Sequence, residues 1–298
     1  MQINQASLRG LYTAYSMAFN KGFQAVESHY NQIATTVPSS TGEQKYSWLG
    51  QMPQMREWIG EREIQNLSAY DYAIKNKKFE MTIAVKRDDI EDDQYGLYSM
   101  QFANMGECAA QHPDNLVFKA LMDGFETPCY DGQPFFSDAH KVEGTTYKNK
   151  SDKKLSSATY LEGRTAIMSI CGDKGQSLNL VPDLLVVPPS LEMTARQILE
   201  AEQIDGTSNV LKGTAKILVE PRLSPKPDYW FLLCTNKFLK PMIYQNRKSI
   251  KLTSMTKDTD ENVFMRDEYL YGADGRSNVG YGFWQMAYGS TGETAAEG

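Results

Sequence analysis

Alternating apolar and polar residues across positions 69–85 constrain this chain more than any other feature of its sequence. Positions 69–74 and 79–85 each repeat with period two, which is typical of strands that bury one face. The polar run Lys75–Lys78 between them predicts a turn, and hence a hairpin. A lone hairpin is marginal in water, and residues 44–86 offer no helix to cover it. Its apolar face must be covered either by the chain's own core or by a neighbouring chain.

The same region carries an unusual aromatic load, which favours burial against another surface, of this chain or of a neighbour. Trp48 and Trp58 lie among glycines and a proline, in a stretch without periodicity. We therefore expect a subunit interface here, extended by apolar residues of the N-terminal segment. The candidate interface residues are Tyr15, Phe19, Trp48, Trp58, Tyr70, Tyr72, Phe79, Met81 and Ile83.

The N-terminal segment predicts a long amphipathic helix. Its apolar residues from Leu8 to Ile33 recur at steps of three and four, which is the helical period. Gly10 and Gly22 weaken this helix locally. Two interpretations stay open: the apolar stripe packs on the chain's own domain, or it belongs to an arm that packs on another subunit.

The remaining sequence mixes helices and strands without a regular strand–helix repeat, which predicts an α+β fold. The acidic run Asp88–Asp93 favours a helix start over a cation site, because carboxylates complement the N-terminal dipole. That helix is expected to break at His112–Pro113, and a second helix to run from Asp114 to Gly124. Further helices are expected at 157–171 and 191–202, and strands at 183–187, 215–221, 229–235, 242–245, 262–271 and 279–288.

Composition narrows the function classes. The formal net charge is −6, from 31 basic and 37 acidic residues, so no basic balance points to specific binding of nucleic acid. The longest apolar runs are strand-sized, which predicts neither a membrane span nor a secretory signal. The four cysteines lack metal-site spacing and are typical of reduced, buried thiols in a cytoplasmic protein.

One cluster of residues suggests chemistry, although the common catalytic and nucleotide-binding motifs are absent from the sequence. Cys129, Asp131, Asp138 and His140 fall within twelve residues and could ligate a metal. The alternative is structural: Asp131 and Gly132 form a turn, and His140 hydrogen-bonds nearby. A metal-dependent hydrolase that uses Asp131, Asp138 and His140 is therefore an alternative function, while the favoured interpretation includes no metal or other cofactor.

The order of these parts resembles the major head subunit of Mu-like phages, over roughly residues 5–289. The residues that carry the resemblance are Val37–Ser39, Tyr46–Gly50 with Arg56–Gly60, Ile74–Lys77 before Phe79–Glu80, and Tyr130–Phe136 with His140. The resemblance implies the HK97-like phage capsid fold, in which an N-terminal arm and an extended hairpin loop (E-loop) reach adjacent subunits. It also implies a peripheral domain built on a long spine helix, and an axial domain at the centre of hexamers and pentamers.

Mapped onto this sequence, the resemblance implies an N-terminal arm at 1–43 and an extended hairpin loop at 44–86. The peripheral domain would comprise 87–174 and 261–298, including a spine helix at 88–124, and the axial domain would comprise 175–260.

The function that the resemblance implies is that of a major capsid protein, which is not an enzyme. It would assemble in the host cytoplasm into the icosahedral shell of the virion. The implied partners are further copies of the chain in hexamers and pentamers, a separate scaffolding protein, portal and decoration proteins, and double-stranded DNA held without sequence specificity; no membrane is involved. An encapsulin-like shell protein of non-viral origin shares the implied fold and is a further alternative.

Overall fold

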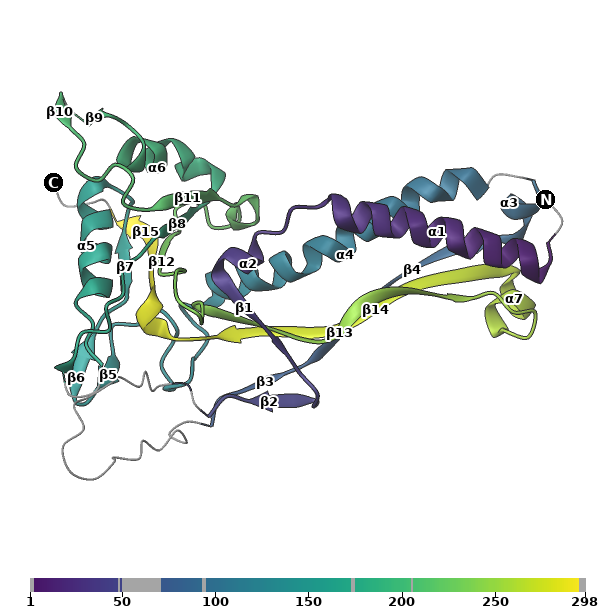
Figure 1. The fold of residues 1–298 in the computed structure, drawn as a ribbon, viewed down its shortest axis with the longest axis horizontal. Coiled ribbons are helices and arrows are strands. Elements are labelled where there is room, and N and C mark those ends of the chain that lie inside the picture. Colours follow the sequence, from purple (N-terminus) through teal and green to yellow (C-terminus); the bar gives the residue numbers. More distant parts are fainter. Residues whose placement is uncertain are drawn as a thin grey trace.

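The computed structural model describes residues 3–47, 49, 71–92, 95–172, 175–204 and 206–294. They form two bodies joined end to end along the longest axis of the molecule (Figure 1). We call the one built around the long helix α4 the long body, and the one built around the five-stranded sheet the compact body. Within the part of the chain that the structure describes, no helix combines the length and the apolar character needed to cross a bilayer.

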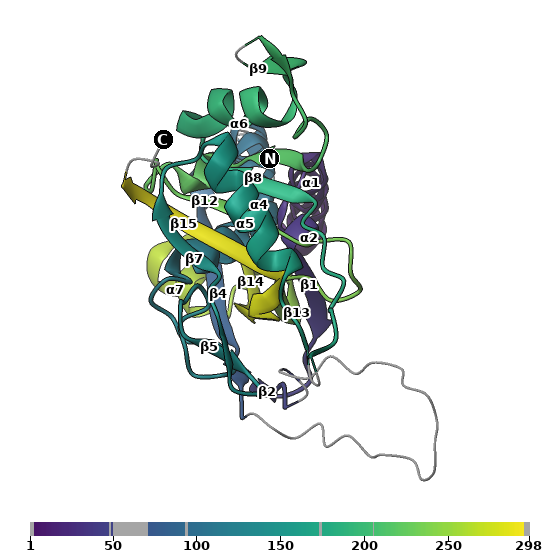
Figure 2. The ribbon, with the colours of Figure 1, turned by 90° about the vertical axis from the view of Figure 1, so that its left-hand side faces the viewer.

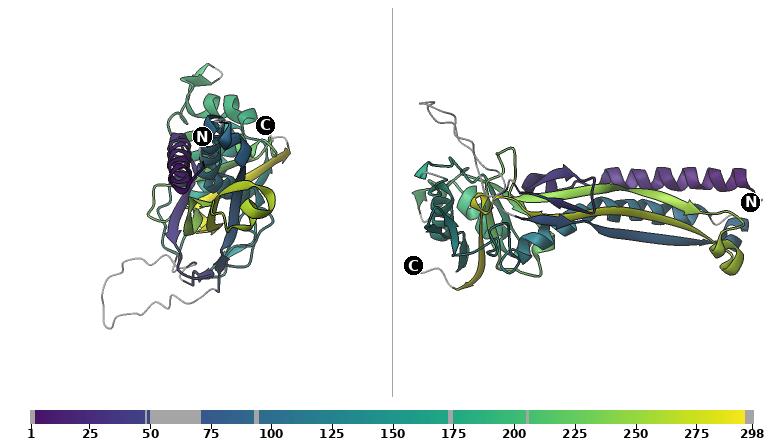
Figure 3. Two further views of the ribbon diagram at one scale, coloured as in Figure 1. Left: turned by 90° about the vertical axis from the view of Figure 1, so that its right-hand side faces the viewer. Right: turned by 90° about the horizontal axis from the view of Figure 1, so that it is seen from below.

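The long body is a four-stranded sheet packed against two helices, α1 (Gln5–Ala25) and α4 (Tyr95–Asp123), which run beside it for most of its length (Figures 1 and 3). β1 pairs in parallel with β13, and the other pairs are antiparallel. In order across the sheet, the strands are β1 (Ala34–Pro38), β13 (Met242–Met255), β14 (Glu268–Tyr281) and β4 (Lys77–Lys86).

Two glycines let α1 and α4 touch backbone to backbone. A Cβ on Gly22 would lie 1.9 Å from the carbonyl oxygen of Ala103, and one on Gly106 would lie 2.0 Å from that of Phe19. Gly22 therefore does more than weaken the N-terminal helix, because a larger residue there would force the two helices apart.

The prediction of a hairpin at 69–85 is wrong for the residues that the structure describes. β3 (Ala73–Lys75) pairs with β2 (Glu43–Lys45), whereas β4 pairs with β14. Asn76 separates β3 from β4, and its side chain donates to Ser39 Oγ and to the carbonyl oxygen of Thr41. The alternation correctly predicts two strands but not their partners, because period two specifies a buried face and not the strand beside it.

The helix break predicted at His112–Pro113 is also wrong. α4 is a 29-residue helix that contains Pro113. It is preceded by α3 (Arg87–Glu91), which takes Asp88 and Asp89 into its first turn. Packing along the whole of α4 outweighs the hydrogen bond that Pro113 cannot make, since Phe102 and Phe118 are fully buried on either side of it.

The compact body is a five-stranded mixed sheet with two helices packed against it (Figure 2). Its strands, in order across the sheet, are β11 (Lys216–Val219), β8 (Leu184–Val187), β12 (Trp230–Leu233), β15 (Ala287–Thr294) and β7 (Lys150–Lys153); its helices are α5 (Ser157–Met168) and α6 (Glu192–Leu199). Smaller elements are α2 (Tyr30–Ile33), β5 (His140–Val142), β6 (Thr145–Tyr147), β9 (Gln203–Ile204), β10 (Thr207–Ser208), α7 (Glu261–Arg266) and the 3₁₀ turns η2 (Pro189–Leu191), η3 (Pro221–Leu223) and η4 (Trp284–Met286).

The two sheets do not follow the domain borders expected from the sequence at 174/175 and 260/261. β7 and β15 lie in the compact body, beside β8 and β12 from the range 175–260. β13, from that same range, lies in the long body. Each sheet collects strands that are far apart in the chain, which no local change of composition reveals.

Candidate functional site

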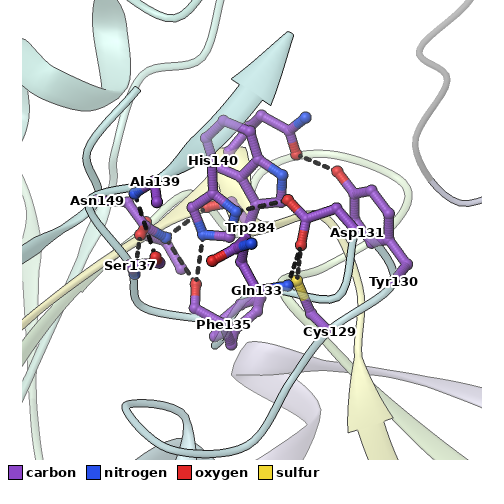
Figure 4. Close-up of polar contacts among 12 residues, drawn as sticks. Cys129, Tyr130, Asp131, Gln133, Phe135, Ser137, Ala139, His140, Asn149 and Trp284 are labelled. Carbon is purple, nitrogen blue, oxygen red and sulfur yellow. Dashed lines mark hydrogen bonds and ion pairs between the residues drawn. The ribbon is translucent and has the colours of Figure 1, made fainter. Parts of the chain in front are cut away.

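The His140 cluster lies at the start of β5, in the chain between α4 and α5 (Figure 4). His140 is completely buried, and its ring stacks on that of Trp284, with the centroids 4.1 Å apart and the planes inclined by 3°. Trp284 belongs to η4, which follows the long strand β14. The stack therefore ties this loop to the C-terminal part of the chain.

Both ring nitrogens of His140 face hydrogen-bond acceptors. Nδ1 lies 2.6 Å from Asp131 Oδ2, and Nε2 lies 3.3 Å from the carbonyl oxygen of Phe135. The other carboxylate oxygen of Asp131 accepts from the Cys129 thiol at 3.1 Å and from the Gln133 N–H at 3.0 Å. The Asp131 carboxylate thus organises the turn and the histidine together.

The charges in this cluster are consistent with its hydrogen bonds. Burial alone would raise the pKa of Asp131, but the hydrogen bond and the charge of His140 outweigh burial and hold that pKa below its ordinary value. Burial raises the pKa of the Cys129 thiol, and the Asp131 carboxylate raises it further. A thiol with a raised pKa stays protonated at neutral pH, as its role of hydrogen-bond donor to Asp131 requires.

Cys129, Asp131 and His140 form a group, among the described residues, whose possible metal-ligating atoms all lie within 4.8 Å of one another. Asp138 is exposed and is not part of this group. A metal bound here would displace the thiol proton and the hydrogen bonds that Asp131 makes with Cys129 and with His140 Nδ1. The geometry therefore favours the structural alternative over the hydrolase.

Asn149 adds further hydrogen bonds to the His140 cluster, and nothing in the sequence singled this residue out. Its side-chain oxygen accepts from the Ser137 N–H at 2.8 Å. Its side-chain nitrogen lies 2.9, 3.2 and 3.1 Å from the carbonyl oxygens of Phe135, Trp284 and Ala287. Asn149 sits in a polar stretch of the sequence, where an asparagine gives no sign that it is buried.

The predicted interface residues of α1 are placed in the chain's own interior. Tyr15 and Phe19 are both buried, and the Tyr15 ring stacks on Phe102 of α4 with the centroids 4.2 Å apart. The contacts seen for these two side chains lie within the chain, as the first interpretation of the N-terminal helix expects. Their contact with a neighbouring subunit stays a prediction.

The predicted interface residues of β4 are half-buried on the side of the sheet that faces α4. Phe79 lies against His112 of α4, with the ring centroids 4.2 Å apart, and Met81 and Ile83 pack on the core between the helices and the sheet. Before β3, the Tyr72 hydroxyl accepts from the Tyr281 N–H at 2.8 Å. The remaining candidates, Trp48, Trp58 and Tyr70, lie outside the described residues.

Several exposed apolar side chains were not singled out from the sequence. On and beside α7, Phe264 is 82% exposed, Met265 69% and Met255 48%. On α4, Leu97 and Met100 are 70% and 80% exposed. The sequence alone does not identify them, because apolar residues in helices and strands are ordinarily expected to lie in the core.

Comparison with known proteins adds to this geometry. A family model described as the Mu-like prophage major head subunit gpT matches residues 8–152, 146–223 and 224–298. The chain is 36% identical over 293 residues to the major capsid protein of Escherichia phage Mu, which covers 98% of this chain and 76% of that protein. It is 34% identical over 290 residues to the Mu-like prophage FluMu major head subunit of Haemophilus influenzae, covering 97% of this chain and 75% of that protein.

A solved structure is similar over the same extent. The fold matches a chain in the procapsid of bacteriophage JBD30 with a TM-score of 0.62 and 36% sequence identity. The match covers 97% of this chain and 76% of the JBD30 chain.

Proposed function

The chain belongs to the Mu-like prophage major head subunit gpT family, and from this premise we propose how its parts serve a shell. It is a major capsid protein with the capsid fold of tailed phages, and it forms the multimeric shell of the virion. The observation that carries this conclusion is the identity of 36% to a phage capsid protein along 98% of the chain.

We propose that the compact body is the axial domain and the long body the peripheral domain of hexamers and pentamers. The support is architectural: α4 runs along the long body as a spine helix would, and the compact body lies at one end of it (Figure 1). β2 pairs with β3, so residues 45 and 73 lie side by side. This pairing supports an extended loop that spans residues 46–72 and is therefore shorter than the loop of 44–86 expected from the sequence.

We propose that shell contacts use the exposed apolar residues Met255, Phe264 and Met265 at the far end of the long body. Exposed apolar side chains that gather at one place mark interaction surfaces. The buried residues Tyr15 and Phe19 would then support the contact surface from beneath.

The proposed partners are a separate scaffolding protein, portal and decoration proteins, and packaged double-stranded DNA. The net charge of −6 supports loose, sequence-independent contact with DNA through scattered lysine and arginine side chains. We also propose that the chain works without catalysis, because the hydrogen bonds of the His140 cluster occupy its donors and acceptors.

Electron microscopy of the full chain, expressed with and without its scaffolding protein, tests the proposal. We expect closed shells with scaffold, and rings, irregular shells or aggregates without it. A stable monomer at high concentration under both conditions would contradict the proposal. Shells that hold a cargo enzyme instead of DNA would favour the encapsulin-like alternative.

A further inference from the structure

A buried cluster of charged side chains lies beside residues 26–33, the segment that connects α1 to β1 and that we call the crossover segment. Asp114 of α4 and Glu220, which precedes η3, are both completely buried. The Arg222 guanidinium lies 2.8 Å from Glu220 Oε1 and 3.5 Å from Asp114 Oδ2. His29 Nδ1 lies 3.1 Å from Glu220 Oε2. The cluster thus brings together the crossover segment, α4 and the compact body.

The side-chain carboxylate of Asp114 binds backbone N–H groups of the crossover segment. Its Oδ1 accepts from the N–H groups of His29 at 3.0 Å and Tyr30 at 2.6 Å. Ile33 is fully buried and Tyr30 packs on the core, with its ring centroid 5.0 Å from that of Tyr244, whereas the other residues of the segment are half-buried or exposed. Polar contacts, with little apolar packing, therefore keep residues 26–29 in place, which is typical of segments that open locally.

The flanking elements do not depend on the cluster. α1 is held against α4 by the close contacts at Gly22 and Gly106, and β1 is held by its ladder with β13 from Ala34 to Pro38. Loss of the cluster would free the crossover segment while both of its ends stay attached.

The η3 turn of the compact body also reaches α4 through this cluster, beside the apolar core that the two share. Arg222 donates from Nε to Asn115 Oδ1 at 2.7 Å, in addition to its two carboxylate contacts. Burial, more than any other influence, raises the pKa of Asp114, against the lowering effects of the Tyr30 N–H and of Arg222. Two buried carboxylates beside each other are costly, and removing their shared arginine or one of their donors leaves a charge uncompensated.

We propose that this cluster is a polar joint that pins the crossover segment to α4 and to the η3 turn of the compact body. Opening it frees the crossover segment, while the apolar core that α4 shares with the compact body stays folded. Because a half-made buried charge network is unfavourable, the joint has two states, made and open.

Hydrogen–deuterium exchange of the full chain tests the joint, in the Asp114→Ala and Glu220→Gln variants. The matched control is Asp123→Ala, which removes an exposed carboxylate of the same helix that pairs with Lys119 at 2.9 Å. In Asp114→Ala we expect amides of 26–33 to exchange about tenfold faster, since a hydrogen bond to a charged group is lost. Exchange in α1 and β12 should stay unchanged, and Asp123→Ala should match the wild type throughout.

Glu220→Gln keeps the shape of the side chain and removes its charge, so it tests how much the compact body contributes to the joint. We expect faster exchange at 26–33 and at residues 221–224, where Glu220 and Arg222 hold the η3 turn. Where Asp114→Ala does not fold, Asp114→Asn replaces it with the same expected pattern.

Wild-type exchange at 26–33 in both variants would overturn the joint. An equal rise in α1 and β12 would also overturn it, because the cluster would then support the cores. An effect of Asp114→Ala alone would remove the compact body from the proposal. These measurements use the subunit in solution, so their failure is distinct from a failure of shell assembly.

Discussion

Gly106 of α4 lies so close to Phe19 of α1 that a Cβ at position 106 would come within 2.0 Å of the Phe19 carbonyl oxygen. Both residues belong to long helices whose mutual distance this contact sets. The outward faces of the long body therefore depend on a residue that has no side chain.

Replacing Gly106 by alanine should destabilise the subunit. The added methyl group meets backbone atoms that cannot rotate away, so we expect the free energy of unfolding to fall by about 1–3 kcal/mol. Gly10→Ala is the matched control on α1, because a Cβ there meets nothing within 4 Å. It should raise the stability by about 0.5–1 kcal/mol. Urea denaturation compares the two, and equal effects would contradict the close contact.

Replacing Asn149 by alanine should loosen the loop around His140. The change strands the Ser137 N–H and the carbonyls that Asn149 now serves. Since each unsatisfied buried group costs about 1–3 kcal/mol, we expect a loss of about 2–4 kcal/mol. The exposed Asn104→Ala on α4 should stay within about 0.5 kcal/mol of the wild type. Thermal unfolding measures both. An Asn149→Ala variant as stable as the wild type would show that the hydrogen bonds of Asn149 are dispensable.

Acid should weaken the same loop through Asp131. Its folded-state pKa lies below the ordinary value of 3.8, so its contribution to stability is complete above that value and is lost as the pH falls through the folded-state pKa. Asp131→Asn should therefore lower stability at neutral pH and flatten its decline in acid. Melting curves between neutral pH and strong acid check this.

The exposed Asp138→Asn is the control for that experiment, since it alters a carboxyl of the same loop that is not part of the cluster. It should keep the wild-type dependence on pH. Parallel curves for all three proteins would mean that Asp131 does not couple the loop to pH.

Removing the apolar surface at α7 should impair assembly and spare the subunit. Phe264→Ser with Met265→Ser changes two side chains that are 82% and 69% exposed, so the melting temperature should hardly change. Particle yield by electron microscopy should fall strongly, because each subunit repeats the contact. Phe264→Leu with Met265→Leu keeps the apolar surface and should assemble. Normal shells from the serine variant would assign this surface another role.

The sequence predicts many strands and helices where one face repeats with a clear period, but the strand expected at 262–271 is wrong in its first half, which is the helix α7. It predicts that Phe79, Met81 and Ile83 share one face of a strand, and in the structure these half-buried side chains all pack on the helix side of β4. It does not predict that β14, almost two hundred residues later, is the neighbour of β4, because alternation contains no information about pairing.

The His140 cluster was only partly predictable. Spacing brought Cys129, Asp131 and His140 together as candidates, and the structure places them in one group. Asp138 shared the spacing but points to solvent, and Asn149 and Trp284 joined from positions that no motif marks. Likewise, local preference predicted a break at Pro113, whereas tertiary packing carried the helix through it.

The position of β15 has a consequence for how the protein is made. It lies inside the compact sheet, between β12 and β7, although it comes later in the chain than every other strand of that sheet. During synthesis the sheet is therefore split, with β7 unpaired beside an open edge of β12, until residues 287–294 leave the ribosome. The compact sheet therefore cannot close before residues 287–294 are synthesised, and we expect shell contacts that need a folded compact body to form only after that point.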